Sequence, residues 1–220
     1  MENKLVKALL WILLICFYVI ATVYVGYFIS HMHIKNTLLE NVTYIFGELL
    51  ITVCLVFLYR KDFKGKFQEL KNPDGNKKII YSLKTWGIGL LTMVIFNIIL
   101  GIFIKDIAVN ESANREVLLT HSLYAITTMT ILTPICEEII FRLSPSKMID
   151  NKYIYVLFTS VMFGFAHVLS ATGLQVLYII PYASLGAAFG LIYNKNQNIL
   201  CSILMHSIHN LACVMIVLFL

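Results

Sequence analysis

Long apolar runs separated by short polar stretches dominate the chain. They lie at residues 6–30, 42–59, 86–104, 118–141, 152–170, 174–193 and 199–220. A helix needs about 20 predominantly apolar residues to cross the hydrocarbon core of a bilayer. Each run is close to that length, and the stretches between them leave little room for a soluble domain. The pattern therefore predicts an all-α, polytopic membrane bundle of about seven transmembrane helices.

Composition supports this assignment. Hydrophobic residues make up 59% of the 220 residues and charged residues only 13%, whereas soluble domains have about 45–50% apolar and about 25% charged residues. The first apolar run is too long for the core of a signal peptide and lacks a clean small-residue cleavage site. We therefore expect it to be retained as a membrane span.

Lysine and arginine are unevenly distributed between alternate connections. If the N-terminus is cytoplasmic, the basic loop at 60–78 and most other basic residues fall on the cytoplasmic side, and only Lys35, Lys105 and Arg115 fall outside. Cytoplasmic connections carry an excess of Lys and Arg, so we expect the N-terminus inside and the C-terminus outside. The net charge of +5 comes mainly from the basic loop. Contact with anionic membrane lipid explains that charge, and no nucleic-acid partner is expected.

The basic loop also divides the chain. Its Asn72-Pro-Asp-Gly-Asn76 segment carries a turn signal. We expect residues 1–78 to form an N-terminal two-helix membrane segment, and residues 79–220 to form a core whose motifs lie within 137–210. Gly186 and Gly190 are spaced for close helix contact.

Prolines and cysteines add two further expectations. Each of Pro134, Pro145 and Pro181 should kink or end its helix. The cysteines are scattered without a pairing pattern, and most lie in apolar runs, so we expect no disulfide framework: Cys16, Cys54, Cys136, Cys201 and Cys213. Cys136 adjoins Glu137, yet its position fits helix packing equally well.

Polar side chains interrupt three of the apolar runs in the second part of the chain. An ionisable group in hydrocarbon costs at least a few kcal/mol and is by default a functional-site hypothesis. Together the groups suit one buried active site, typical of an intramembrane hydrolase. They are Glu137, Glu138, Arg142, His167, His206 and Asn210.

The first group combines two carboxylates with an arginine. Glu138 and Arg142 are four residues apart, so they share a helix face and can pair. Glu137 is rotated by about 100° from that face and has no obvious local partner, which suits a general base. The alternative is an ion pair at the membrane boundary, with Glu137 reaching the headgroups.

The other two groups carry histidines. Phe163 and His167 lie on one helix face, so the aromatic ring can support the imidazole, although a lone histidine in an apolar helix is often structural. His206 and Asn210 also share a face, and both can donate hydrogen bonds, as an oxyanion site requires. His209 points partly aside, and we interpret it as a packing residue.

These motifs resemble a known family. Glu137-Glu138-x-x-x-Arg142, Phe163-x-x-x-His167 and His206-x-x-x-Asn210 are similar to the signature of the CPBP intramembrane proteases. That family includes the CAAX prenyl endopeptidases and bacterial proteins linked to bacteriocin processing or self-immunity. The resemblance covers roughly residues 118–220 and implies a membrane-embedded protease, glutamate-dependent or metallo-type, in a bacterial plasma membrane.

The resemblance also implies roles for the residues. Glu137 and His167 would activate the attacking water, and His206 and Asn210 would stabilise the oxyanion. Glu138, Arg142 and Phe163 would orient the site. No cofactor is certain: Glu137, His167 and His206 could together bind Zn²⁺, but the chain has no HExxH motif. A metal-free, glutamate-dependent mechanism fits these residues at least as well.

The expected reaction is endopeptidase cleavage of a membrane-associated or lipidated peptide or protein. Two alternatives stay open. The chain could be a non-catalytic membrane protein for bacteriocin self-immunity or for regulation of a membrane sensor, or a small transporter with a proton relay through Glu137 and the histidines. Glu48, in the second apolar run, could pair with a site residue or bond a neighbouring helix.

Overall fold

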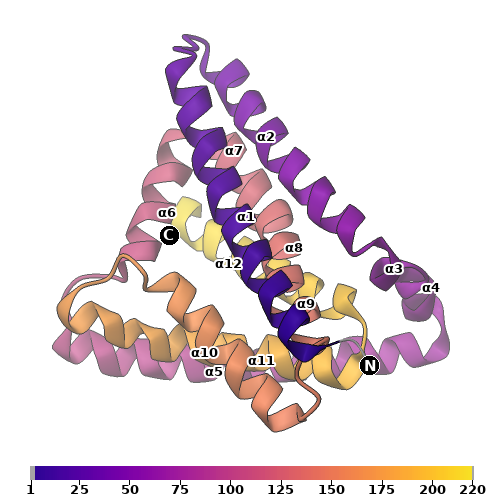
Figure 1. Ribbon diagram of the computed structural model, residues 1–220. Coiled ribbons are helices and arrows are strands. Elements are labelled where there is room, and N and C mark those ends of the chain that lie inside the picture. Colours follow the sequence, from indigo (N-terminus) through magenta and orange to yellow (C-terminus); the bar gives the residue numbers. More distant parts are fainter. Residues whose placement is uncertain (1–2, 220) are drawn as a thin grey trace.

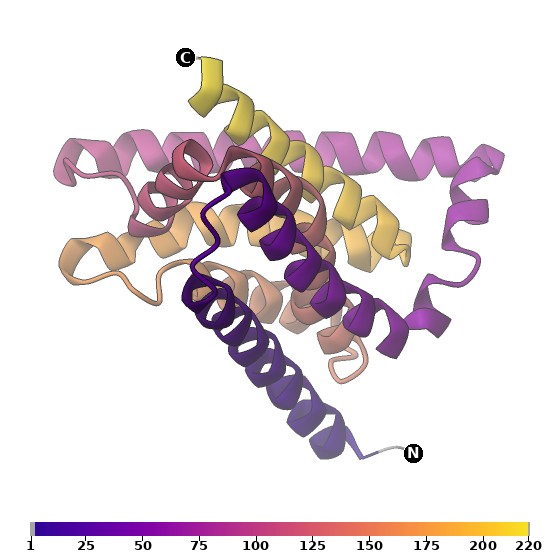
Figure 2. The same ribbon diagram turned by 90° about the horizontal axis from the view of Figure 1, so that it is seen from above.

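The computed structural model describes residues 3–219, and over this range every regular element is a helix (Figures 1 and 2). This confirms the predicted all-α membrane bundle. The N-terminal part consists of a helical hairpin, two short helices in the basic loop, and one long helix. Their bounds are α1 Lys4–His31, α2 Thr37–Leu58, α3 Arg60–Phe63, α4 Lys66–Lys71 and α5 Pro73–Phe103.

The second part begins with a polar helix, continues through an unbroken helical stretch from Ser122 to Ser146, and ends in three longer helices. The polar helix is α6 Val109–Thr120. The unbroken stretch comprises α7 Ser122–Thr127, the π-helical turn η1 Thr128–Leu132, α8 Thr133–Glu138, the π-helical turn η2 Ile139–Leu143 and α9 Ser144–Ser146. The remaining elements are α10 Lys152–His167, the 3₁₀ helix η3 Gly173–Tyr178, α11 Ile179–Asn196 and α12 Ile199–Phe219.

Six helical segments of the described chain are long and apolar enough to cross a membrane. They are Lys4–His31, Thr37–Leu58, Pro73–Phe103, Ser122–Ser146, Gly173–Asn196 and Ile199–Phe219. The expected span at 152–170 corresponds to α10, which has 16 residues and is shorter than the others. The expected span at 118–141 is divided, because its first residues belong to α6.

Helix α11 lies at the centre of the bundle and packs against both α10 and α5. Small residues allow the close approach to α10. A Cβ atom on Gly186 would lie 3.0 Å from the Cα of Ser160, and one on Gly190 would lie 2.9 Å from the Thr159 hydroxyl. The close helix contact predicted for Gly186 and Gly190 is therefore confirmed.

Polar contacts tie together the connections at one end of the bundle, which we call the basic end (residues 4–7, 59–78, 147–152 and 194–198). Lys4 pairs with Asp150 at 2.5 Å, and Lys147 pairs with Asp62 at 2.7 Å. The Asn198 amide donates to the Lys66 carbonyl at 2.9 Å. These contacts join the start of α1, the basic loop and the two C-terminal connections.

The turn expected at 72–76 is wrong. Asn72 precedes α5, and Pro73 occupies its first turn together with Asp74 and Gly75. Proline at the first helical position and an acid in the first turn favour a helix start as much as a turn. Gly75 is needed for a packing reason, because a Cβ atom there would lie 2.0 Å from the Leu70 carbonyl oxygen.

Replacement of Gly164 by alanine should destabilise the α10–α11 contact. The new Cβ atom would lie 2.7 Å from the Ile179 carbonyl oxygen, and overpacking of this kind costs about 1–3 kcal/mol. Gly101→Ala on α5 is the matched control, because no atom lies within 4 Å of its new Cβ. Thermal unfolding in detergent should show a lower midpoint for Gly164→Ala and an unchanged or higher midpoint for the control. Equal midpoints would contradict the close packing.

Glu69 should make the stability of the basic end depend on pH. Hydrogen bonds from Lys66 and then Lys78 lower the pKa of the Glu69 carboxyl to about 2. Because the folded pKa lies below the unfolded value, about 4.3, this contribution is full above the unfolded pKa and is lost as pH falls towards 2. Wild type should therefore unfold at a higher temperature than Glu69→Gln at pH 7, and the difference should shrink by pH 3. A difference that stays constant over that range would contradict the assignment.

Candidate active site

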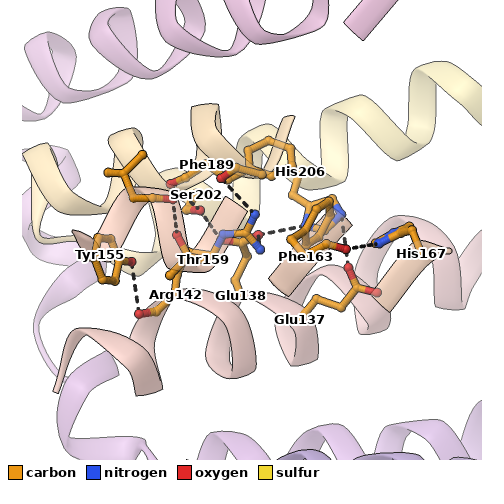
Figure 3. A network of polar contacts seen from close by, with 12 residues as sticks. Glu137, Glu138, Arg142, Tyr155, Thr159, Phe163, His167, Phe189, Ser202 and His206 are labelled. Carbon is orange, nitrogen blue, oxygen red and sulfur yellow. Dashed lines mark hydrogen bonds and ion pairs between the residues drawn. The ribbon is translucent and has the colours of Figure 1, made fainter. Parts of the chain in front are cut away.

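The residues singled out in the sequence converge from three helical segments (Figure 3). Glu137 and Glu138 lie on α8, His167 is the last residue of α10, and His206 and Asn210 lie on α12. A cavity of about 320 Å³ lies between these segments. Its lining includes Glu137, Phe163, His167, His206 and Asn210.

Glu138 is the centre of a buried polar network. Its carboxylate is inaccessible to solvent, lies 3.2 Å from an Arg142 guanidinium nitrogen, and accepts hydrogen bonds from His206 Nδ1 at 2.9 Å and from the Ser202 hydroxyl. A buried charge costs several kcal/mol unless it is paired and hydrogen-bonded. These three partners supply both conditions, and the Glu138–Arg142 pair expected from their spacing is present.

Arg142 is held between aromatic rings as well as by Glu138. Its guanidinium carbon lies 4.3 Å from the centre of the Phe163 ring and 5.3 Å from that of Phe189. A second guanidinium nitrogen donates to the Gly186 carbonyl at 3.3 Å. A cation over an aromatic face is stabilised by the ring quadrupole, so Arg142 is a fixed countercharge with no access to the cavity.

His206 links the network to the cavity. Because its Nδ1 donates to Glu138, its Nε2 faces Glu137, whose carboxylate oxygen lies 3.7 Å away. The imidazole stacks on Phe189 with a centroid distance of 4.7 Å, and it meets Phe163 edge-on. The ring is therefore fixed in orientation by these two aromatic neighbours and by Glu138.

Glu137 differs from its neighbour. Its side chain is 16% exposed and lines the cavity. One carboxylate oxygen is buried and has no hydrogen-bond partner among residues 3–219. The separation from His206 exceeds hydrogen-bonding distance, and a gap of that kind suits a bridging water. A carboxylate held in this way can bind and activate a water.

His167 approaches the cavity from α10. Its Nδ1 donates to the Phe163 carbonyl at 2.8 Å, which leaves Nε2 available. The ring packs on Phe163 at 4.4 Å and stacks on Tyr182 at 4.6 Å. The aromatic support expected from Phe163 is therefore present, and Figure 3 shows His167 and Glu137 on the same side of the site.

Two π-helical turns flank the glutamates, and each is followed by a proline. Thr133 N–H bonds the Thr128 carbonyl and Ser144 N–H bonds the Ile139 carbonyl, both five residues back. In this register the Met129 carbonyl would accept from the N–H of residue 134, and the Ile140 carbonyl from that of residue 145. Both residues are prolines, which have no N–H. The helix continues through Pro134 and ends at Ser146, directly after Pro145.

Side chains from other helices satisfy the two carbonyls that the prolines leave free. The Asn210 amide donates to the Met129 carbonyl at 2.8 Å, and the Trp11 indole donates to the Ile140 carbonyl at 2.8 Å. An unsatisfied carbonyl in an apolar interior costs several kcal/mol. These two bonds therefore fix the motif helix against α12 and α1.

Sequence reasoning missed several residues of this site. Ser202 lies four residues before His206 on α12, so its shared helix face is a signal that could have found it. Phe189 and Tyr182 on α11 stack on the two histidines, and Trp11 comes from the first helix. Nothing in their spacing indicates these contacts, because they depend on how separate helices pack.

The residues do not form the metal site considered above. Among residues 3–219, no group of three His, Cys, Asp or Glu side chains is placed to hold a metal ion. Nδ1 of His206 is used by Glu138 and Nδ1 of His167 by a backbone carbonyl, so in both rings only Nε2 remains for another partner. Cys136 is buried and contacts the Thr52 hydroxyl at 3.3 Å, which fits packing.

Trp11→Phe should destabilise the protein because it leaves the Ile140 carbonyl without a partner. The expected loss is about 1–3 kcal/mol in unfolding free energy, the cost of a buried unsatisfied group. Trp86→Phe is the matched control, since the Trp86 indole nitrogen has no hydrogen-bond partner in the described part of the chain. Unfolding in detergent, followed by circular dichroism, checks the difference; equal losses for both variants would contradict the role of the indole hydrogen bond.

The chain can now be compared with known proteins. Residues 119–212 match the family model described as type II CAAX prenyl endopeptidase Rce1-like. An uncharacterized protein of Mycoplasma capricolum is 25% identical over 199 residues, covering 84% of this chain and 56% of that protein. The UPF0177 protein YxdF of Lactococcus lactis is 35% identical over 81 residues, covering 37% of this chain and 43% of that protein.

The chain spans about half the length of these curated relatives, and no solved structure matches it. All three motifs, from Glu137 to Asn210, lie inside the segment that matches the family model. The segment at 119–212 is therefore similar to the Rce1-like CAAX prenyl endopeptidases, the protease family that the motifs resemble.

Proposed function

We propose that the protein is an intramembrane endopeptidase that hydrolyses a peptide bond with a water activated by Glu137. The observation that carries this proposal is one Glu137 oxygen that has no hydrogen-bond partner among residues 3–219 and is buried at a cavity that His167 and His206 also line. A general base must lie within reach of the proton that it removes, directly or through one water. The match of residues 119–212 to the model of a protease family supports the same reaction.

The proposed reaction consumes one water for each bond cleaved. Glu137 accepts a proton from the water while the water oxygen attacks the carbonyl carbon of the peptide. His167 Nε2 helps to hold that water. The tetrahedral intermediate then collapses as the C–N bond breaks, and Glu137 returns the proton to the leaving nitrogen. The products are a carboxylic acid and an amine.

Stabilisation of the oxyanion falls to His206 and Asn210. A protonated His206 donates from Nδ1 to Glu138 and has a second donor at Nε2, which faces the cavity. Asn210 uses one amide N–H on the Met129 carbonyl and has another free to donate. Donors preorganised where charge develops are worth about 10²–10³ in rate each. Glu138, Arg142 and Phe163 hold these donors in place.

No step of this mechanism passes through a metal, since the proposed residues act through their own protons and lone pairs. The proposed substrate is a membrane-associated peptide or lipidated protein, and membrane lipid surrounds the enzyme. The proposed location is a bacterial plasma membrane with the N-terminus in the cytoplasm. The spanning helices and the family match support the membrane part of this assignment.

Glu137→Gln should abolish cleavage while the fold persists. The amide cannot accept the proton, and loss of a general base lowers rates by about 10²–10⁴. Detergent-purified wild type and variant should be compared on a panel of prenylated and leader-type peptides, with Glu116→Gln on the exposed face of α6 as the control. Full activity of Glu137→Gln on a peptide that wild type cleaves would contradict the proposal.

Chelation tests the metal-free mechanism separately. Wild-type cleavage should be unchanged after treatment with EDTA and removal of the chelator by dialysis. Loss of cleavage that Zn²⁺ restores would contradict proton transfer by Glu137 alone, and it would favour a metal held in the same cavity.

A further inference from the structure

The cavity that contains the site residues extends to the polar helix α6. Its lining includes four polar residues of that helix as well as Glu137 and His167: Asn110, Glu111, Asn114 and Arg115. Arg115 and Glu111 form an ion pair at 2.8 Å, and their side chains are 45% and 33% exposed. Helix α6 is not among the candidate membrane spans of the described chain. The mouth of the cavity is therefore a polar rim, and polar rims suit an aqueous interface.

Helix α6 lies at the opposite end of the bundle from the basic end. Helix α5 runs from Pro73, beside the basic loop, to Phe103, just before α6. Polar contacts join the connections at this second end, since the Gln175 amide donates to the Ile107 carbonyl at 3.2 Å and the Tyr178 hydroxyl donates to the Asp106 carbonyl at 3.0 Å. Figures 1 and 2 both show α4 and α6 on opposite sides of the molecule.

The site is closed towards the basic end. Six side chains on that side of His206 are at most 1% exposed, and the apolar ones among them belong to one hydrophobic core cluster. This buried layer comprises Glu138, Arg142, Phe189, Ile192, Ile199 and Met205. Below it, Asn198 in the connection between α11 and α12 is buried and bonds Lys66 and Glu69. Polar substrate has no route to Glu137 through this layer.

The two ends of the bundle also differ in the number of basic residues that they carry. Most Lys and Arg residues lie at the basic end, whereas the opposite end carries Lys35, Lys105 and the paired Arg115. Cytoplasmic connections of membrane proteins are the ones enriched in Lys and Arg. This bias places the basic end in the cytoplasm and the α6 end outside.

We propose that the cavity opens beneath α6 to the extracytoplasmic side of the membrane. The part of this inference that concerns substrate rests on the proposed peptidase function: the substrate is a peptide segment presented from that side. A lipidated C-terminus in the cytoplasm would meet the closed basic end instead.

The depth of the site in the membrane limits where along the substrate the cleaved bond can lie. Counted from Lys152 at about 1.5 Å per residue, His167 lies about 22 Å from the basic end. The hydrocarbon core is about 30 Å thick, which leaves about 8 Å to the opposite interface. An extended chain covers about 3.3–3.6 Å per residue. Counted in the same way from Asn198, His206 lies about 12 Å from the basic end, so the scissile bond lies about two to five residues inside the outer interface.

Thiol labelling tests the orientation without any substrate. Ser112→Cys on α6 and Lys64→Cys in the basic loop both replace exposed residues outside the cavity lining. A membrane-impermeant maleimide, added to intact and to permeabilised cells, should label Ser112→Cys in both and Lys64→Cys only after permeabilisation. Wild type, with its five native cysteines, gives the background. Thr172→Cys, exposed in the connection before η3, is a second probe of the α6 end and should behave like Ser112→Cys.

The reversed pattern, or labelling of the α6-end probes only after permeabilisation, would overturn the orientation whatever the enzymatic result.

Two mirrored reporters then test the substrate class. Both carry the same single membrane span and flanking peptide, and the flank is placed outside in one and in the cytoplasm in the other. Wild type should cleave only the outside flank, and Glu137→Gln should cleave neither. Cleavage of the cytoplasmic flank would overturn the substrate assignment. If labelling follows the expected pattern and neither reporter is cleaved, the assignment of outside-flank peptides as substrates and the peptidase proposal fail, while the orientation stands.

Discussion

Burial of the Glu138 carboxylate is the constraint on which the rest of the site depends. A charge removed from water must be neutralised and hydrogen-bonded, and Glu138 meets both needs through Arg142, His206 and Ser202. These partners come from two different helical segments, so the carboxylate holds α12 against the helix that carries it. The same contact orients His206, because its Nδ1 is used and its Nε2 must face Glu137. Two adjacent glutamates thus have different environments: Glu138 is saturated with partners, and Glu137 keeps a free oxygen at the cavity.

The backbone around the glutamates is subject to the same constraint: its buried polar groups need hydrogen-bond partners. A π turn with a following proline leaves one carbonyl free, and the interior offers no water to satisfy it. Asn210 and Trp11 take these positions, so a helix that contains two breaks is fixed to two neighbours at the breaks. Such π turns are frequent at functional sites. Asn210 therefore has two roles, since the side chain that satisfies the Met129 carbonyl also lines the cavity.

Much of this could be predicted from the sequence. Apolar runs predicted the helical membrane bundle, and spacing of four residues predicted that Glu138 meets Arg142 and that Phe163 supports His167, since residues so spaced share a helix face. Spacing could not predict the contacts of Trp11, Phe189 and Tyr182, which depend on the packing of separate helices. The start of α5 at Pro73 was missed because a Pro-Asp-Gly segment fits a turn and a helix start equally well. The π turns were not predicted, because the prolines that follow them indicate a kink or an end of a helix and not its hydrogen-bonding register.

A double-mutant cycle on the buried pair tests the central claim most directly. The unfolding free energy in mixed detergent micelles should be measured for wild type, Glu138→Gln, Arg142→Met and the double variant, with the exposed pair Glu111→Gln and Arg115→Met as the matched control cycle. Each buried single variant should lose about 3–5 kcal/mol, because it strands an unpaired charge. The double variant should lose no more than the worse single one, and the control cycle should couple by less than about 1 kcal/mol. Additive losses in the buried cycle would contradict a structure organised around Glu138.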